Sequence, residues 1–297
     1  MSVLSNTVPV EKGFSAFIKR NPLVSYFVLA YGLMWLSISP MVVDALGIAD
    51  VPDAISFISF ILSSLVGPSV AAFWVTGVLE GKPGMRLLLR RTFQFRAGLQ
   101  WYLVVLIVPL IIWFSAYTPL YNGAPLVGLI SNPSLLLSIF LPNVLIGLLI
   151  PSLGEEAGWR GFALPRLQKL YGPILGTLIL GTLHGVWHLP ALLTPMFDPF
   201  TIPGFIEFVS TAIAGSFLYT WVYNKTGGNV WIVIVLHASG NAAVKLLSEL
   251  IPQDVAFSGW LEVLNSGWIN LIAFGVVAVI LLIVTRGRLG YQPDRAS

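Results

Sequence analysis

The stretch LLIPSLGEEAGWRGFA, residues 148–163, places two adjacent glutamates and an arginine inside a chain that is otherwise strongly apolar. The acidic pair is Glu155 and Glu156, and Arg160 follows one helical turn later. Charged residues make up only 10% of the 297 residues. A charge at the centre of a bilayer costs about 2.5–3.5 kcal/mol on insertion scales. Polar groups kept in an apolar segment at that cost usually serve a function.

The composition around this stretch is that of an integral membrane protein. Hydrophobic residues make up 56% of the chain and the mean hydropathy is +0.85, more than a soluble core of this length would use. The chain has no cysteine, which excludes disulfides, thiolate metal sites and a cysteine nucleophile. The net charge of +3 is explained by basic residues next to apolar segments, so we expect no nucleic acid partner.

Eight apolar segments are long enough to cross a bilayer as helices, for which about 20 residues suffice. They lie near residues 22–44, 54–79, 100–119, 134–155, 172–195, 203–224, 229–250 and 266–285. We therefore expect an all-α, multi-pass protein with one integral membrane domain over residues 1–297. Its short loops and compact length are typical of a prokaryotic plasma membrane protein.

The distribution of charge predicts the orientation of these segments. One side collects most of the basic residues, namely Lys12, Lys19, Arg20, Lys82, Arg86, Arg90, Arg91, Arg96, Arg160, Arg166, Lys169, Lys225, Arg286, Arg288 and Arg295. The other side has one basic residue, Lys245, beside Asp44, Asp50, Asp53, Asp198, Glu249, Asp254 and Glu262. The positive-inside rule then places both termini in the cytoplasm. Residues 81–100, basic and apolar, are expected to form an interfacial helix on an anionic leaflet.

The spacing of the acidic stretch gives its two carboxylates different surroundings. In a helix, Glu156 and Arg160 share one face, whereas Glu155 points roughly 100° away. Glu156 and Arg160 can therefore form an ion pair that offsets their burial, which leaves Glu155 free to face a cavity as a base. The alternative is a frayed cytoplasmic helix end whose charges are solvated.

The three histidines of the chain also lie in apolar segments. His184 and His188 are four residues apart and share a helical face, which suits metal ligation, proton transfer or a hydrogen-bonded network. His237 and Asn241 form a second pair with the same spacing. Either pair could instead be structural, as packing residues or as hydrogen bonds between helices.

We expect these groups from three helices to converge in one water-filled cavity that opens to the cytoplasm. Residue counts present a difficulty, because a helix ending near Glu155 places that residue at the cytoplasmic face and His188 well past the midplane. We expect a break or tilt at Pro142 or Pro151, or a fifth helix that begins outside the bilayer, to bring them to one depth.

In order and spacing, these residues resemble the motifs of the CAAX protease and bacteriocin-processing (CPBP, or Abi) family, which includes the type II CAAX prenyl endopeptidases. The motifs of other intramembrane proteases, His-Glu-x-x-His, Gly-x-Ser-Gly and Gly-x-Gly-Asp, are absent. The resembling region covers residues 138–246 and contains, in order, Glu155-Glu156-x-x-x-Arg160, His184-x-x-x-His188 and His237-x-x-x-Asn241. The chain departs from the family at His184, where phenylalanine is usual.

The resemblance implies an intramembrane endopeptidase that cleaves a membrane-tethered, prenylated or other peptide substrate with an activated water. The implied roles are water activation by Glu155 and His188, oxyanion stabilisation by His237 and Asn241, and support of the site by Glu156 and Arg160. It also implies a zinc site, with Glu155, His188, His237 and His184 as ligands, although a metal-free glutamate mechanism is equally compatible with the family.

Two other classes of function fit the same residues. One is a noncatalytic bacteriocin-immunity or peptide-binding membrane protein that keeps the motifs without turnover. The other is a proton-coupled transporter, since Glu and His in membrane helices also build ion relays. Haem ligation by the histidines is a weaker option. The sequence makes no prediction of the oligomeric state.

Overall fold

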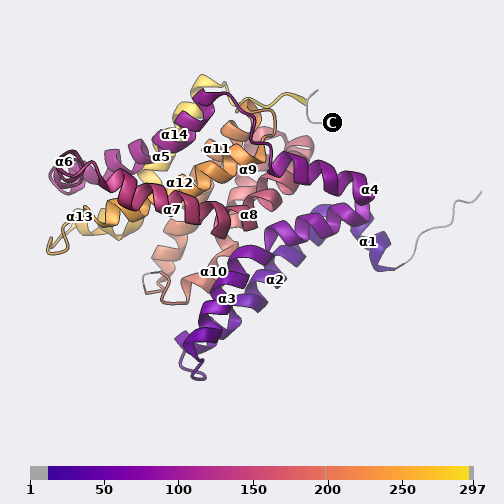
Figure 1. Ribbon diagram of the computed structural model, residues 1–297, viewed down its shortest axis with the longest axis horizontal. Helices are drawn as coiled ribbons and strands as arrows, with labels where there is room; N and C mark the ends of the chain where they lie inside the picture. The colour runs from indigo at the N-terminus through magenta and orange to yellow at the C-terminus, as the bar shows by residue number, and fades with distance from the viewer. Residues whose placement is uncertain (1–12, 198, 294–297) are drawn as a thin grey trace, which may run out of the picture.

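A computed structural model describes residues 13–197 and 199–293, and in these ranges all regular secondary structure is helical (Figure 1). Lys12, Asp198 and Arg295, which contribute to the expected charge pattern, lie outside the described residues. The helices, with π-helical segments labelled η, are α1 (Phe14–Arg20), α2 (Pro22–Ala45), α3 (Asp53–Val66), α4 (Pro68–Thr92), α5 (Leu99–Leu120), α6 (Ala124–Ser131), η1 (Leu136–Phe140), α7 (Leu141–Gly147), η2 (Leu148–Ser152), α8 (Leu153–Gly158), η3 (Trp159–Ala163), α9 (Leu164–Trp187), α10 (Leu189–Leu192), α11 (Ile202–Lys225), α12 (Val230–Ser248), α13 (Trp260–Val263), η4 (Leu264–Trp268) and α14 (Ile269–Val284).

Within the described residues, six helical stretches are long and apolar enough to cross a membrane. A seventh is obtained if α3 and α4, which are bent by 43° at Gly67, form one span. The all-α, multi-pass architecture expected from the sequence is therefore present, but eight spans are not confirmed. The difference arises at Leu136–Trp187, one helical stretch of 52 residues that covers most of the expected fourth and fifth segments. At about 1.5 Å per residue this stretch is more than twice as long as a bilayer core.

Two breaks in this long stretch bring its polar residues together. The helix is interrupted at Ile150 (φ −146°, ψ 118°), where the following proline restricts the backbone to the extended region. Beyond Glu155 the helix continues instead of ending, and the chain reverses at Gly172, whose φ of 76° favours glycine. About 25 Å of helix separates Gly172 from Glu155 on one side and from His188 on the other. The two residues therefore return to the same level, which removes the difficulty of depth.

The helix ends that carry basic residues meet at one end of the bundle. Arg166 pairs with Glu80 at 2.7 Å, and Asn224 on α11 donates hydrogen bonds to Gln168 and to the carbonyl of Leu289. The side-chain amide of Asn229 donates a hydrogen bond of 2.9 Å to the carbonyl of Gln94. We call this the basic end, formed by residues 82–98, 165–172, 224–229 and 285–293. Its placement in the cytoplasm, with both termini, stays a prediction.

The expected interfacial helix is shorter than the sequence suggested. α4 is broken at Gly81 (φ 64°, ψ −157°), and a helix follows from residue 82 to residue 92 with Leu88 buried and Arg86 and Arg90 exposed. Residues 94–98 are not helical, so residues 81–100 do not form one helix. Binding of this surface to an anionic leaflet stays a prediction.

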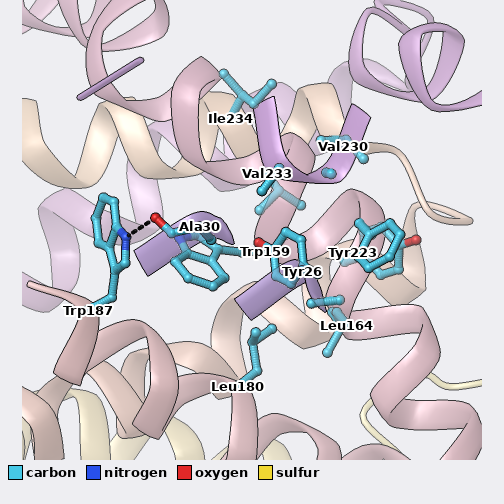
Figure 2. Packing of buried hydrophobic residues seen from close by; sticks show 14 of the residues in the cluster. Tyr26, Ala30, Trp159, Leu164, Leu180, Trp187, Tyr223, Val230, Val233 and Ile234 are labelled. Carbon is cyan, nitrogen blue, oxygen red and sulfur yellow. Dashed lines mark hydrogen bonds between the residues drawn. The ribbon is translucent and has the colours of Figure 1, made fainter. Parts of the chain in front are cut away.

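An aromatic cluster holds the end of α9 against α2 (Figure 2). The indole of Trp187 donates a hydrogen bond of 3.1 Å to the carbonyl of Ala30. Trp35 in turn donates one of 3.0 Å to the carbonyl of Trp187. The hydroxyl of Tyr31 donates to the carbonyl of Leu183. Two of these bonds go to carbonyls near the C-terminal end of α9, and that of Trp187 has no further turn of α9 to donate to it. They fix the turn of helix that carries His184 and His188.

Two glycines allow α8 to pack directly on the backbone of α3 and α4. A Cβ atom at Gly154 would lie 2.0 Å from the carbonyl oxygen of Ser64, and one at Gly158 would lie 2.4 Å from that of Pro68. Small residues four positions apart are typical of close helix contacts in membranes. This contact sets the position of the two glutamates that lie between the glycines.

We expect Gly154→Ala to lower the thermal stability of the purified protein, because the added methyl group meets backbone that cannot move aside. Overpacking of this kind typically costs about 1–3 kcal/mol. The matched control is Gly32→Ala on α2, where a Cβ atom would meet nothing within 4 Å. Thermal unfolding in detergent compares the two variants, and equal unfolding temperatures would contradict the close contact.

Candidate active site

Glu155 on α8 and the two histidines of α9 form one cluster. The carboxylate of Glu155 accepts a hydrogen bond of 2.9 Å from Nε2 of His184, and the imidazole rings of His184 and His188 lie 5.1 Å apart. One ligand atom from each of these three residues lies within 4.8 Å of the others. The predicted sharing of one helical face by the histidines is therefore confirmed, and Glu155 and His188 are close enough to share a water molecule.

The backbone of α9 fixes the tautomer of His188. Its Nδ1 lies 3.0 Å from the carbonyl oxygen of His184, and because a carbonyl only accepts, Nδ1 carries the proton. Neutral His188 then presents an unprotonated Nε2, which can accept a proton or bind a metal. His188 lines the cavity described below.

Glu156 belongs to a second, separate network. Nη1 of Arg160 lies 3.1 Å from both oxygens of Glu156, and Nδ1 of His237 lies 2.8 Å from one of them. Glu156 and Arg160 are 0% and 1% exposed, and Glu155 is 3% exposed. The ion pair predicted from spacing is therefore present, and the alternative of a solvated helix end is wrong. Arg160 is inside the bundle and does not belong to the basic end.

Helix α11 contributes two residues to this network that the sequence did not single out. Nη2 of Arg160 lies 3.4 Å from Oγ of Ser216, and its guanidinium lies 4.5 Å from the ring centre of Tyr219. A buried guanidinium has more donors than one carboxylate can accept, so further partners on a neighbouring helix were to be expected. In the sequence, the i,i+3 spacing of Ser216 and Tyr219 on one face of a helix could have indicated such partners.

A cavity of about 330 Å³ brings the separate motifs together. Glu155, His188, His237 and Asn241 all line it, whereas Glu156, Arg160 and His184 lie behind these residues. Its walls are otherwise mainly apolar, and they include Trp187 and Phe208. The arrangement combines a carboxylate base, an imidazole and an amide around one space, which is what attack of water on a carbonyl requires.

The exposed residues that line the cavity lie outside the basic end. Met196 and Phe197, which are 43% and 37% exposed, line it from the connection between α10 and α11. No segment of the basic end contributes a lining residue. Asn241 on α12 is a further exposed lining residue. The cytoplasmic opening of the cavity stays a prediction.

The donor set of the first cluster fits a zinc ion. Glu155, His184 and His188 offer one oxygen and two nitrogens, the type of set that leaves a fourth position for water. The bond from Nδ1 of His188 to a carbonyl is the usual outer support of a histidine ligand. His237, the fourth ligand expected from the resemblance, is not in this group and instead bonds to Glu156. A metal on Nε2 of His184 would replace the proton now shared with Glu155.

We expect His184→Phe, which restores the residue usual in the resembling family, to weaken zinc binding about tenfold or more, because a ligand is lost. Zinc affinity is measured on chelator-stripped protein by competition with a metal-sensitive dye. The control, His237→Gln, leaves the three-residue cluster intact and should bind zinc as the wild type does. Equal affinities of wild type and His184→Phe would exclude this cluster as the zinc site.

Part of the chain is similar to known proteins. Residues 137–243 match the family model described as type II CAAX prenyl endopeptidase Rce1-like. This range contains every residue of the two networks and nearly equals the region 138–246 in which the motifs were recognised. A curated relative, CAAX prenyl protease 2 of Methanococcus maripaludis, is 27% identical over 144 residues, which are 46% of this chain and 49% of the relative. The chain thus matches about half the length of that protein.

Proposed function

We propose that the chain, whose residues 137–243 match the model of the Rce1-like type II CAAX prenyl endopeptidases, is an intramembrane endopeptidase. It would hydrolyse a peptide bond of a membrane-tethered substrate. The observation that supports this most is the convergence of Glu155, His188, His237 and Asn241 on one cavity. These residues come from three helices, and the remaining polar groups of the site lie behind them as supports.

In the proposed mechanism, Glu155 and His188 bind the attacking water, and Glu155 takes its proton as the water oxygen bonds to the scissile carbonyl carbon. His237, in its doubly protonated form with Nδ1–H donated to Glu156, donates its Nε2–H to the carbonyl oxygen. The amide of Asn241 donates a second hydrogen bond to this oxygen, which becomes the oxyanion. The carbon–nitrogen bond then breaks, and the proton moves from Glu155 to the leaving amine. The products are a new carboxylate and a new amino terminus.

Glu156 and Arg160 support the site by fixing the orientation of the His237 ring. Glu156 binds Nδ1 of His237 at 2.8 Å, which leaves Nε2 as the ring atom available to the substrate. Arg160 holds Glu156 through both carboxylate oxygens. A zinc ion bound by Glu155, His184 and His188 would supply Lewis-acid activation of the same water.

Cleavage in reconstituted vesicles tests the proposal. Lipid-anchored candidate peptides, prenylated and unprenylated, are incubated with the protein in ¹⁸O-labelled water, and the products are analysed by mass spectrometry. One labelled oxygen in a new C-terminal carboxylate is the expected result. Peptide binding without any product would indicate a noncatalytic binding protein, and proton flux across vesicles without cleavage would indicate a transporter.

The orientation of the cavity adds a constraint on the substrate. If the basic end is cytoplasmic, the mouth near Met196 lies in the opposite half of the bilayer, and the scissile bond must reach that side. The candidate substrates are then membrane-anchored peptides whose cleaved segment has been exported.

We expect a cysteine at Met196, but not one at Arg90 on the basic end, to react with a membrane-impermeant maleimide in intact cells. The chain has no cysteine of its own, so each variant carries a single thiol, and both positions are exposed. Permeabilised cells serve as the control, in which Arg90→Cys should also react. The reverse pattern in intact cells would place the mouth in the cytoplasm.

A further inference from the structure

A second cavity, of about 360 Å³, adjoins the catalytic one. The two share Phe197 and Phe208 as lining residues, and the second is further lined by Phe200, Phe205 and Glu207. The ring of Phe208 lies 5.2 Å from that of His188 on one side and 5.8 Å from that of Phe197 on the other. The two cavities are therefore neighbours, and Phe197 and Phe208 line both.

Glu207 is a buried carboxylate without a positive partner. It is 7% exposed, Thr211 donates a hydrogen bond of 2.8 Å to its Oε1, and Asn270 is its other polar neighbour. Oε2 lies against Gly267, where a Cβ atom would come within 2.7 Å. Among the ion pairs of the described residues, none involves Glu207. A buried carboxylate is costly unless a cation compensates it.

We propose that this cavity, which we call the Phe–Glu pocket (Phe197, Phe200, Phe205, Glu207 and Phe208), binds a cationic side chain, lysine or arginine, of the substrate next to the scissile bond. The proposal rests on the proposed peptidase function, because it assigns a specificity subsite to the same cavity. Aromatic rings attract ammonium and guanidinium groups, and a buried carboxylate accepts strong charge-assisted hydrogen bonds from them. The same walls accommodate the apolar stem of such a side chain.

The charge of the pocket favours a cation over an anion or a purely apolar group. An anionic side chain would meet Glu207 as a like charge, and an apolar one would leave the carboxylate uncompensated. The pocket also lies at the mouth of the catalytic cavity, because Phe197 belongs to the exposed rim. A cation can thus reach Glu207 from the side on which the substrate enters.

Binding of matched peptides tests the proposal without requiring cleavage. The Glu155→Gln variant, in lipid nanodiscs, is titrated by calorimetry with an apolar acetylated tetrapeptide containing lysine and with the same peptide containing acetyl-lysine. We expect the lysine peptide to bind about tenfold more tightly. Adding Glu207→Gln, which keeps the shape of the side chain, should abolish that preference and leave the acetyl-lysine peptide unaffected. Adding Glu262→Gln, on the exposed helix α13, should change neither affinity.

A second variant guards against loss of folding. Phe200→Leu keeps the pocket apolar but removes one aromatic ring, and we expect it to reduce the lysine preference by a smaller factor than Glu207→Gln does. Equal binding of the two peptides, no binding of either, or a preference that survives Glu207→Gln would overturn the proposal. A Glu207-dependent preference in a wild-type protein that cleaves no peptide would retain the pocket and reject the peptidase function.

Discussion

Replacing Glu155 by glutamine is expected to lower the rate of peptide cleavage by about 10²- to 10⁴-fold, the usual contribution of a general base. Glutamine has the shape of glutamate and can still bond to Nε2 of His184, so the fold should be retained. It cannot take a proton from water, so the attacking oxygen loses its activation. The initial rate of cleavage in vesicles, at a substrate concentration well below KM, measures the effect.

The matched control for this substitution is Glu262→Gln, the same chemical change at an exposed site on α13. It should leave the cleavage rate unchanged. Thermal unfolding of each variant separates loss of catalysis from loss of structure. A Glu155→Gln protein that is folded and cleaves at the wild-type rate would remove Glu155 from the mechanism, whatever its position in the cavity.

The local part of this site could be predicted from sequence because it depends on helical periodicity alone. The ion pair of Glu156 with Arg160 and the stacking of His184 and His188 follow from i,i+4 spacing. The close approach of α8 to its neighbours has the same origin, with Gly154 and Gly158 on one face.

Contacts between distant segments could not be predicted in this way. The bond between Glu155 and His184 depends on the reversal at Gly172, which the sequence-based prediction treated as the start of a span and not as a turn within one helical stretch. A hydropathy window averages over some 20 residues and does not register a single glycine with positive φ. The count of eight spans was based on the length of apolar segments alone. In the structure that apolar length is distributed over bent helices, which a hydropathy window does not detect.

The direction of the cavity mouth also lies beyond what periodicity can show. The depth of His188 along α9 is set by its distance from Gly172, but which end of the cavity is open depends on the connection between α10 and α11. That connection is short, irregular and rich in phenylalanine, and no periodic pattern identifies the residues that cover the site. The Phe–Glu pocket is formed by the same segment and by the start of α11.

The second large effect concerns Arg160, whose guanidinium is 1% exposed and has a carboxylate, a hydroxyl and an aromatic ring as partners. Arg160→Gln is expected to destabilise the protein by about 3–5 kcal/mol, because it leaves the carboxylate of Glu156 buried with His237 as its remaining partner. The free energy of unfolding is measured by denaturant titration in mixed micelles. The loss of charge balance, and not the loss of size, is the expected cause.

The double variant Glu156→Gln, Arg160→Gln separates these two causes. If an unpaired charge dominates, removing both charges should be less damaging than Arg160→Gln alone, with a favourable coupling between the two positions. The double variant should nevertheless cleave poorly, because a neutral glutamine holds His237 less firmly than the carboxylate does. Destabilisation equal to the sum of the single variants would show that the two side chains act independently, and the ion pair would then not be the element that holds His237 at the cavity.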